Sequence, residues 1–524
     1  MASQTQSAEL GASGRKTYGQ ILKSSALIGG SSALNIAFSI VRTKVLALLL
    51  APAGIGLFGV YGSILDLVRA IGGMGINTSG VRQIAEAVGS GESQRVARTV
   101  TTLRRVAFIL GALGALLLVI FCKPVSQFSF GDVRHAGSVA LLALAAFFMD
   151  VSAGQGAVVQ GMRRIGDLAR MSVFGALYGT IFGIGIVYYF YQRGEAERGV
   201  VPSLVCVAAM SILTSWWYSR KIKVERVTMA FADISSEVSA LLKLGFVFMA
   251  VNLMTLAVAY LVRIIVLRKI GEDAAGFYQA AWVLGGLYVG FILQAMGADF
   301  YPRLTAVAND NAECNRMVNE QAEVGLLIAG PGVLGTLTFA PLVIQIFYSA
   351  KFGPAVEILR WICLGMMLRV ASWPMGFILG AKGARQTIFW SELAACGIQI
   401  GLAWVCVLGF GLKGTGIAFF VSYVCYWCLI YAIVRLVSGF RWSVANCKLM
   451  LLFVPLVGAV FVSWYYLPRI ATTILGGVVT LVSGVCSART LSKLIPWERL
   501  PHSVQKTLRF FRLAPPNTVP DAEE

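Results

Sequence analysis

Apolar runs of about 20 residues recur along the chain from Ser24 to Ala488, and each is long enough to cross the ~30 Å hydrocarbon core of a bilayer. The composition agrees, because 57% of the 524 residues are hydrophobic and only 13% are charged, about half the share of a soluble domain. The 56 glycines suit helices that pack closely in a membrane. The sequence therefore predicts an all-α integral membrane protein and excludes a string of soluble domains.

These runs predict about fourteen transmembrane helices. The connections on the side of the two termini hold roughly three times as many Lys and Arg residues as the opposite ones, which predicts that both termini are cytoplasmic. The opposite connections are all short, so none is expected to fold into a catalytic domain. The expected helices are 24–48, 56–80, 100–122, 137–160, 168–191, 200–219, 241–267, 276–301, 323–347, 357–381, 386–410, 414–436, 447–467 and 470–488.

A charged connection after the sixth predicted helix divides the chain into two halves that begin alike. Val41-Arg42 precedes Gly56 in the first half, and Val262-Arg263 precedes Gly276 in the second. Parallel six-helix halves are typical of alternating-access transporters, with a binding site between the two lobes. We expect a polar cytoplasmic tail over 1–20, a six-helix lobe over 21–220, a cytoplasmic linker over 221–240, a second six-helix lobe over 241–437, two extra helices over 438–488 and a basic cytoplasmic tail over 489–524.

Ionisable residues deep in the predicted helices are costly in a bilayer and are therefore candidates for function. Asp66 and Arg69 lie near the middle of helix 56–80, and their i,i+3 spacing puts them on one face. They form either a neutralising structural pair or a cavity-facing pair that binds substrate or ions. Asp150, in helix 137–160, is either an ion-coupling carboxylate or the partner of an arginine on another helix.

Four more basic residues of the predicted helices are candidates to line a cavity: Arg42, Lys44, Arg263 and Arg369. Arg42 and Arg263 either line a cavity or extend to the outer interface, where long side chains place their charge in water. Arg369 precedes Pro374, which removes a backbone hydrogen bond and is expected to kink its helix. Because basic residues outnumber acids in these helices, we expect an anionic ligand, and an arginine fork suits a diphosphate.

The sequence lacks the signatures of several kinds of chemistry. It has no Gly-rich loop ending in Lys-Ser/Thr, which excludes ATP hydrolysis by a P-loop. Its two histidines, His135 and His502, do not make a histidine-rich metal site, and no Ser-His-Asp set is recognisable. We therefore expect a transporter rather than an enzyme, without catalytic residues, metal, cofactor or nucleic-acid partner.

The segment around the first two predicted helices is distinctive. Val41-Arg42-Thr43-Lys44-Val45-Leu46-Ala47 leads into Ala51-Pro52-Ala53-Gly54-Ile55-Gly56-Leu57-Phe58, and Gly72-Gly73-Met74-Gly75-Ile76 follows. This segment resembles the N-terminal region of Wzx-type O-antigen and polysaccharide flippases, in the multidrug/oligosaccharidyl-lipid/polysaccharide (MOP) exporter superfamily. Ala51 stands where glycine is common in that pattern. Beyond residue 90 the resemblance rests on the number of helices and on the similar start of the second half.

The resemblance implies two six-helix lobes in a V, as in MATE-like exporters, around a cavity that opens to one side at a time. It implies movement of undecaprenyl-diphosphate-linked oligosaccharide, of the O-antigen or enterobacterial common antigen type, from the cytoplasmic to the periplasmic leaflet of the bacterial inner membrane. A proton or ion gradient would drive this movement. The implied partners are the lipid-linked glycan, membrane lipids and the polysaccharide polymerase machinery. Arg42, Lys44, Asp66 and Arg69 would face the first-lobe cavity.

Other functions stay open at this point. A cation-coupled exporter of drugs or metabolites uses the same fold, and an acidic cavity would favour it. A membrane glycosyltransferase, polymerase or ligase would typically carry a large outward loop with catalytic residues, which the predicted topology lacks. A scaffold for a glycan assembly complex would tolerate neutralisation of every buried charge.

Overall fold

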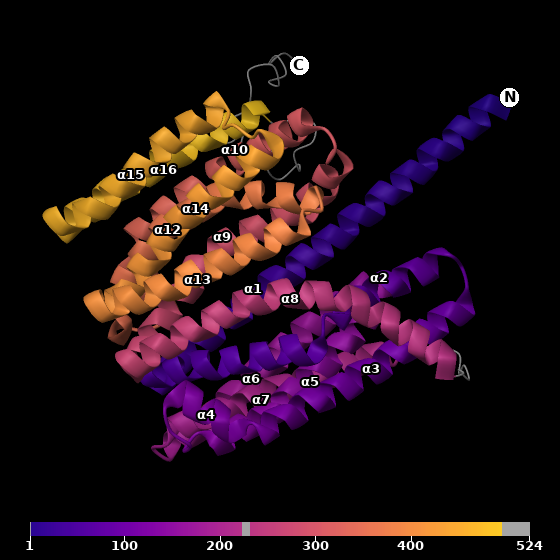
Figure 1. The fold of residues 1–524 in the computed structure, drawn as a ribbon, viewed down its shortest axis with the longest axis horizontal. Coiled ribbons are helices and arrows are strands. Elements are labelled where there is room, and N and C mark those ends of the chain that lie inside the picture. The colour runs from indigo at the N-terminus through magenta and orange to yellow at the C-terminus, as the bar shows by residue number, and fades with distance from the viewer. Residues whose placement is uncertain (1, 223–230, 495–524) are drawn as a thin grey trace, which may run out of the picture. The chain divides into compact units, whose positions relative to one another are not determined.

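The computed structural model describes residues 2–222 and 231–494 (Figure 1). Side chains are described from Gly30 onward, apart from most of 231–248 and several positions between 251 and 302. The predicted linker and the predicted basic tail therefore fall partly outside the described residues. The chain divides into two compact units, Met1–Gly276 and Phe277–Glu524, and each is described by itself. The boundaries of the two predicted lobes stay a prediction.

The first unit is built from helices alone in its described part. They are α1 (Ala2–Gly73), α2 (Ile76–Gly89), α3 (Ser93–Ile120), α4 (Cys122–Phe130), α5 (Ala136–Gly161), α6 (Ile165–Gln192), the 3-10 turn η1 (Ala196–Gly199), α7 (Val200–Ser219) and α8 (Phe231–Lys269), and α9 (Glu272–Ala306) begins at its end. In the second unit α9 is followed by α10 (Asn311–Thr338), α11 (Ala340–Phe347), η2 (Ala350–Phe352), α12 (Ala355–Ala381), α13 (Arg385–Phe410), η3 (Gly411–Lys413), α14 (Gly414–Ser438), α15 (Val444–Tyr466) and α16 (Arg469–Leu494).

Nine helical stretches of the described residues are long and apolar enough to cross a membrane, or ten if α10 and α11 count as one broken span. α10 and α11 meet at an angle of 79°. Two of the nine stretches, Gly30–Gly73 and Arg385–Ser438, each contain a break and hold two of the predicted helices. The predicted all-α membrane fold is confirmed. The predicted number of fourteen spans is compatible with these helices.

α1 contains two helical segments that meet at Ala51. This residue has φ 55° and ψ −173°, and Pro52 follows it. Proline disfavours a helical conformation in the residue before it and cannot donate a backbone hydrogen bond, so the first helix ends here. The break falls between the predicted helices 24–48 and 56–80, as expected.

The helix predicted over 56–80 is interrupted at Gly73. Met74 has φ 43° and Gly75 has φ 65°, and α2 starts only at Ile76. Glycine adopts this left-handed backbone readily, whereas a side chain such as that of Met74 is strained there. The glycine-rich sequence therefore ends α1 where a continuous apolar run predicts more helix.

Close approach of backbones holds the start of the second α1 segment against the start of α9. A β-carbon on Gly276 would overlap the carbonyl oxygen of Pro52, and one on Gly56 would overlap that of Glu272. The two glycines that correspond in the two halves of the sequence thus pack against each other.

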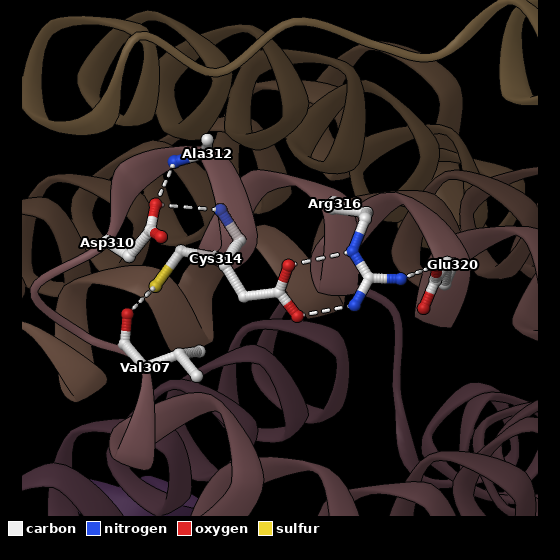
Figure 2. A network of polar contacts seen from close by, with 7 residues as sticks. Val307, Asp310, Ala312, Cys314, Arg316 and Glu320 are labelled. Carbon is white, nitrogen blue, oxygen red and sulfur yellow. Dashed lines mark hydrogen bonds and ion pairs between the residues drawn. The ribbon is translucent and has the colours of Figure 1, made fainter.

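A polar network surrounds the connection between α9 and α10 in the second unit (Figure 2). The Asp310 carboxylate accepts hydrogen bonds from the amides of Ala312 and Glu313, at 2.9 and 3.1 Å, and so caps α10. Arg316 forms ion pairs with Glu313 and, at 2.6 Å, with Glu320 (Figure 2). These contacts place the first turns of α10 in a polar environment.

Asparagines of α10 connect the same end of the second unit to later helices. Asn315 Nδ2 donates to the carbonyl of Ser438 at 2.9 Å, which joins α10 to the end of α14. Asn319 Oδ1 accepts from the Ser443 amide at 2.8 Å and from Asn446 Nδ2 at 3.0 Å, at the start of α15. The extra helix α15 is therefore anchored to α10 by hydrogen bonds at this end.

Candidate functional site

A pocket of about 460 Å³ opens in the first unit, between α1, α2, α5 and α8. Its floor lies at the break between α1 and α2, where Gly73 and Gly75 contribute backbone rather than side chain. The polar side chains that line it are Asp66, Arg69, Asn77, Thr78, Asp150 and Asn252. Charged groups and neutral hydrogen-bonding groups thus meet in one concave site within a helical membrane protein.

Arg69 and Asp150 form an ion pair in the wall of this pocket, with 3.6 Å between Nε and Oδ1. The Asp150 side chain is 6% exposed and that of Arg69 is 27% exposed, so the carboxylate is covered while the guanidinium reaches the pocket. The sequence left two roles open for Asp150, and the structure gives it an arginine partner on another helix. It does not bring Arg69 into an ion pair with Asp66, the neighbour on its own helix that the spacing suggested, among the described residues.

Glycines make room for the Asp150 carboxylate. A β-carbon on Gly72 would lie 3.3 Å from Asp150 Oδ2, and one on Gly111 would lie 3.2 Å from Asp150 Cβ. Gly114 packs against Gly72 in the same way, with 3.2 Å between the added carbon and the Gly72 Cα. α1, α3 and α5 therefore approach closely because small residues meet at their interface.

The Arg69–Asp150 pair leaves polar atoms unused. In the part of the chain that the structure describes, Arg69 Nε and Asp150 Oδ2 are buried without a hydrogen-bond partner. Buried polar atoms are usually hydrogen-bonded, so such atoms at a pocket wall need an explanation. An incoming ligand with oxygen acceptors would satisfy the guanidinium.

Asp66 interacts electrostatically with two arginines, Arg69 on its own helix and Arg263 on α8. Arg263 is 8% exposed and donates from Nη1 to the carbonyl of Ala259 at 2.9 Å. It is therefore buried within the first unit. Arg42 and Lys44 lie on α1 before the break, are partly buried and do not line this pocket.

The pocket is less basic than the sequence suggested. Its lining holds two carboxylates, Asp66 and Asp150, and one guanidinium, Arg69. The expected excess of basic residues therefore does not describe this pocket. No group of residues able to hold a metal ion occurs in the described ranges.

Arg369 lies in the second unit, on α12, and belongs to a different cluster. Its guanidinium carbon is 6.0 Å from the centre of the Tyr423 ring on α14. Nearby, Tyr426 Oη donates to Glu392 Oε1 of α13 at 3.4 Å. Glu392 is half-buried beside this tyrosine. Only the packing of α13 on α14 brings these residues together.

Arg360 is fully buried on α12, although its sequence position was not among the predicted site residues. Its Nη1 donates to the Leu337 carbonyl of α10 at 3.0 Å, and its Nη2 donates to the Val460 and Phe461 carbonyls of α15 at 3.2 and 2.9 Å. The guanidinium also lies 4.6 Å from the Trp464 ring. Arg360 therefore connects three helices and has a structural role. An arginine inside a predicted apolar helix was the available signal.

Comparison with known proteins identifies the family of this chain. Residues 45–357 match the model of the family described as polysaccharide biosynthesis protein. The chain belongs to this family. A related curated protein is the lipid III flippase of Escherichia coli strain K12, which is 22% identical over 419 residues, 78% of this chain and 97% of the relative. The lipid III flippase of Shigella flexneri matches to the same extent.

Solved structures of the same superfamily show the fold of this chain. An inward-facing multidrug resistance MATE transporter of the MOP superfamily matches with a TM-score of 0.65 and 14% identity, over 79% of this chain and 99% of that one. The lipid II flippase MurJ in an inward closed conformation matches with a TM-score of 0.62 and 14% identity, over 90% and 99%. The fold and the family that the sequence suggested are thus confirmed.

Proposed function

We propose that this chain is a flippase that moves a lipid-linked oligosaccharide between membrane leaflets for the synthesis of a surface polysaccharide. Its substrate is an undecaprenyl-diphosphate-linked repeat unit, and the movement is from the cytoplasmic to the periplasmic leaflet of the bacterial inner membrane. The observation that carries this proposal is the pocket that Arg69, whose Nε has no hydrogen-bond partner, lines together with Asn77 and Asn252, in a chain of the polysaccharide biosynthesis family. The lipid III flippase relatives support it.

In this proposal Arg69 binds the diphosphate and the neighbouring amides bind sugar hydroxyls. A guanidinium binds two phosphate oxygens at once, which gives both affinity and orientation. Asn77, Thr78 and Asn252 supply neutral donors and acceptors at the same wall of the pocket. The lipid tail stays in the bilayer while the headgroup is exposed first on one side and then on the other.

The diphosphate and the Asp150 carboxylate then compete for Arg69, and this competition links substrate binding to ion uptake. When Arg69 turns to the diphosphate, the Asp150 carboxylate loses its partner in a covered position. An uncompensated buried charge is strongly unfavourable, so Asp150 takes up a proton or a cation at that step. Release of the substrate on the other side restores the ion pair and expels the ion. Because the ion enters and leaves together with the substrate, a gradient that falls from the cytoplasm to the periplasm can drive the cycle in this way without ATP.

The wider arrangement follows the same proposal. Both termini are cytoplasmic, the transport site is exposed to one side of the membrane at a time, and Arg42, Lys44, Arg263 and Arg369 add positive charge along the path of the diphosphate. The delivered repeat units pass to a polysaccharide polymerase. The two predicted extra helices, α15 and α16, both contact α10.

A second candidate function is the export of small cationic compounds coupled to an ion gradient. Two observations favour it: the pocket holds two carboxylates, Asp66 and Asp150, and a MATE transporter shares the fold with a TM-score of 0.65. The relatives of known activity favour the flippase.

The test is a leaflet assay in proteoliposomes, with an undecaprenyl-diphosphate oligosaccharide that is detected only in the outer leaflet. We expect protein-dependent movement that falls roughly tenfold to hundredfold in Arg69→Gln, the range for loss of a charge-assisted hydrogen bond. Arg82→Gln is the control, because Arg82 is 66% exposed and pairs with Glu86 away from the pocket. Wild-type flipping in a folded Arg69→Gln protein would reject the site. Efflux of a small cation without any glycolipid movement would reject the flippase.

A further inference from the structure

A second concave surface lies on the outside of the first unit, between α6 and α7, which pack side by side (Figure 1). Their contact depends on three glycines of α6 spaced four residues apart. β-Carbons on Gly175, Gly179 and Gly183 would lie 3.1 to 3.3 Å from Thr214 or Val207 of α7. Such spacing of small residues lets two helix backbones approach closely in a membrane.

Aromatic residues precede each of these glycines and form one wall of a groove. Phe174, Tyr178 and Phe182 occupy neighbouring turns of α6, and the Phe174 and Tyr178 rings stack at 6.0 Å. α7 supplies the other wall, which includes Leu213 and Trp217. The groove holds about 400 Å³, and these five side chains are exposed. The close contact of α6 and α7 fixes the width of the groove.

Two basic residues, Arg220 and Lys221, lie at the end of α7, two and three residues after Tyr218 of the groove lining. The Arg220 guanidinium lies 3.9 Å from the Trp217 ring centre and 4.7 Å from that of Trp216. Lys221 Nζ lies 4.5 Å from the Tyr218 ring centre. Stacking on aromatic rings holds each cation in place next to the groove.

The antiparallel course of α6 and α7 puts the start of α6 at the same end. Arg170 lies one turn before Phe174 on the aromatic stripe, and its guanidinium is 3.8 Å from Asp167. Asp167 also pairs with Arg164 at 3.0 Å. One carboxylate therefore offsets one of the two arginine charges at the start of α6, and Arg220 and Lys221 on α7 add two more positive charges at this end.

We propose that the groove is a binding site for an anionic phospholipid, with one acyl chain between α6 and α7 and the headgroup phosphate on Arg220 and Lys221. Basic groups beside apolar grooves between transmembrane helices are suited to acidic headgroups. Acyl chains gain little by leaving the bilayer for a protein groove, since both are apolar. Selectivity therefore comes from the two cations, and the groove sets the position of the chain.

The site is separate from the pocket of Arg69 and Asp150, and its ligand is a membrane lipid rather than the transported glycolipid. Other occupants of the groove predict different behaviour. A neutral lipid that only fills the apolar space would bind as well as an acidic one. A free phosphate ion would need only the cations and would displace the lipid.

The experiment measures retention of phosphatidylglycerol by the detergent-purified full chain in native mass spectrometry, with phosphatidylethanolamine as the zwitterionic comparison. We expect selective retention of phosphatidylglycerol. The double variant Arg220→Gln/Lys221→Gln is expected to bind it roughly 30-fold more weakly, because each basic residue near an anionic headgroup strengthens binding about fivefold. Arg193→Gln is the matched control, since Arg193 also stacks on an aromatic ring, at 4.4 Å from Tyr189, but lies at the opposite end of α6.

A second variant tests the groove without touching the cations. Leu213→Trp fills the space between the helices and is expected to lower phosphatidylglycerol retention while thermal unfolding stays unchanged. Equal retention of both lipids, displacement by millimolar inorganic phosphate, or unchanged binding in Leu213→Trp would each overturn the proposal. Because the readout is binding rather than flipping, failure of this site and failure of the flippase assignment are distinguishable.

Discussion

Arg69 Nε of α1 lies 3.6 Å from Asp150 Oδ1 of α5, although the two residues are far apart in the sequence. This pair closes one wall of the pocket in the first unit and gives the covered carboxylate its charge partner. An ion pair that must separate to bind a ligand links substrate occupancy to the charge of Asp150.

The first prediction concerns this pair. Arg69→Asp and Asp150→Arg should each lower the thermal stability and abolish flipping, because each leaves two like charges in contact. The double reversal should recover much of the unfolding temperature, because opposite charges again face each other. It should not recover flipping, because the guanidinium then projects from α5 instead of α1. Full recovery of flipping in the double variant would show that the pair is only structural.

Gly111 should be sensitive to any added side chain. In Gly111→Val the new methyl groups would meet Asp150 Cβ, which lies 3.2 Å from a β-carbon at this position. We expect the overpacking to cost about 1–3 kcal/mol of folding free energy and to lower flipping as Asp150 moves. Gly185→Val is the control, because a β-carbon at Gly185 has no atom within 4 Å outside its own helix. Equal effects of the two variants would contradict the prediction. Thermal unfolding measures the loss of folding free energy, and the leaflet assay measures the loss of flipping.

Gly276→Ala should destabilise the protein through a backbone clash. The added methyl group would overlap the Pro52 carbonyl, and backbone cannot rotate away as a flexible side chain can. We expect a loss of about 1–3 kcal/mol, seen as a lower unfolding temperature. Gly290→Ala on the same helix α9 has open space around its β-carbon and should be neutral. A normal unfolding temperature for Gly276→Ala would disprove the close contact.

Arg360→Met should loosen α15 from the rest of the second unit. The substitution removes the donors to the Leu337, Val460 and Phe461 carbonyls. The Val460 carbonyl keeps the Ser463 hydroxyl as a donor, so we expect a cost of about 1–3 kcal/mol, mainly from the Leu337 carbonyl near the end of α10. Hydrogen exchange in α15 should accelerate. Arg469→Met is a matched control, since Arg469 also lies over Trp464, at 6.0 Å, but is exposed. Unchanged hydrogen exchange of α15 in Arg360→Met would contradict the role of Arg360 in attaching α15 to α12.

The stability of the first unit should depend on pH through Glu272, which precedes the predicted span 276–301. Loss of water around its carboxyl, and then the neighbouring Glu197 carboxylate, raise the pKa of Glu272, while His135 opposes the shift. A raised pKa means that the folded state holds the proton more tightly, so this group destabilises the fold as pH rises past its unfolded pKa of about 4.3. Glu272→Gln should therefore unfold at a higher temperature than wild type at pH 8. The difference should vanish near pH 4, and a constant difference would argue against the effect.

Much of the candidate site was accessible from the sequence. Asp66, Arg69 and Asp150 stand out because a charge is rare in an apolar run, and all three line one pocket. Arg42 and Lys44 stood out for the same reason and yet do not line it. A charged residue is rare in an apolar run because burying any charge in a membrane is costly. Its rarity therefore does not indicate which way the side chain points or which residue it pairs with.

The sequence by itself determined that this chain is a helical membrane protein with costly charges in its spans. The reason is that the free energy of transferring a helix into a bilayer is a sum over residues that are close in sequence. Pro52 also determined locally where the first helix breaks. The tertiary structure decided that Arg69 pairs with Asp150 rather than Asp66, that Arg263 is buried, and that Arg360 connects three helices. These outcomes depend on which helices pack together and on glycines such as Gly72 and Gly111 that let them approach. Distances between helices are not written in any local stretch of sequence.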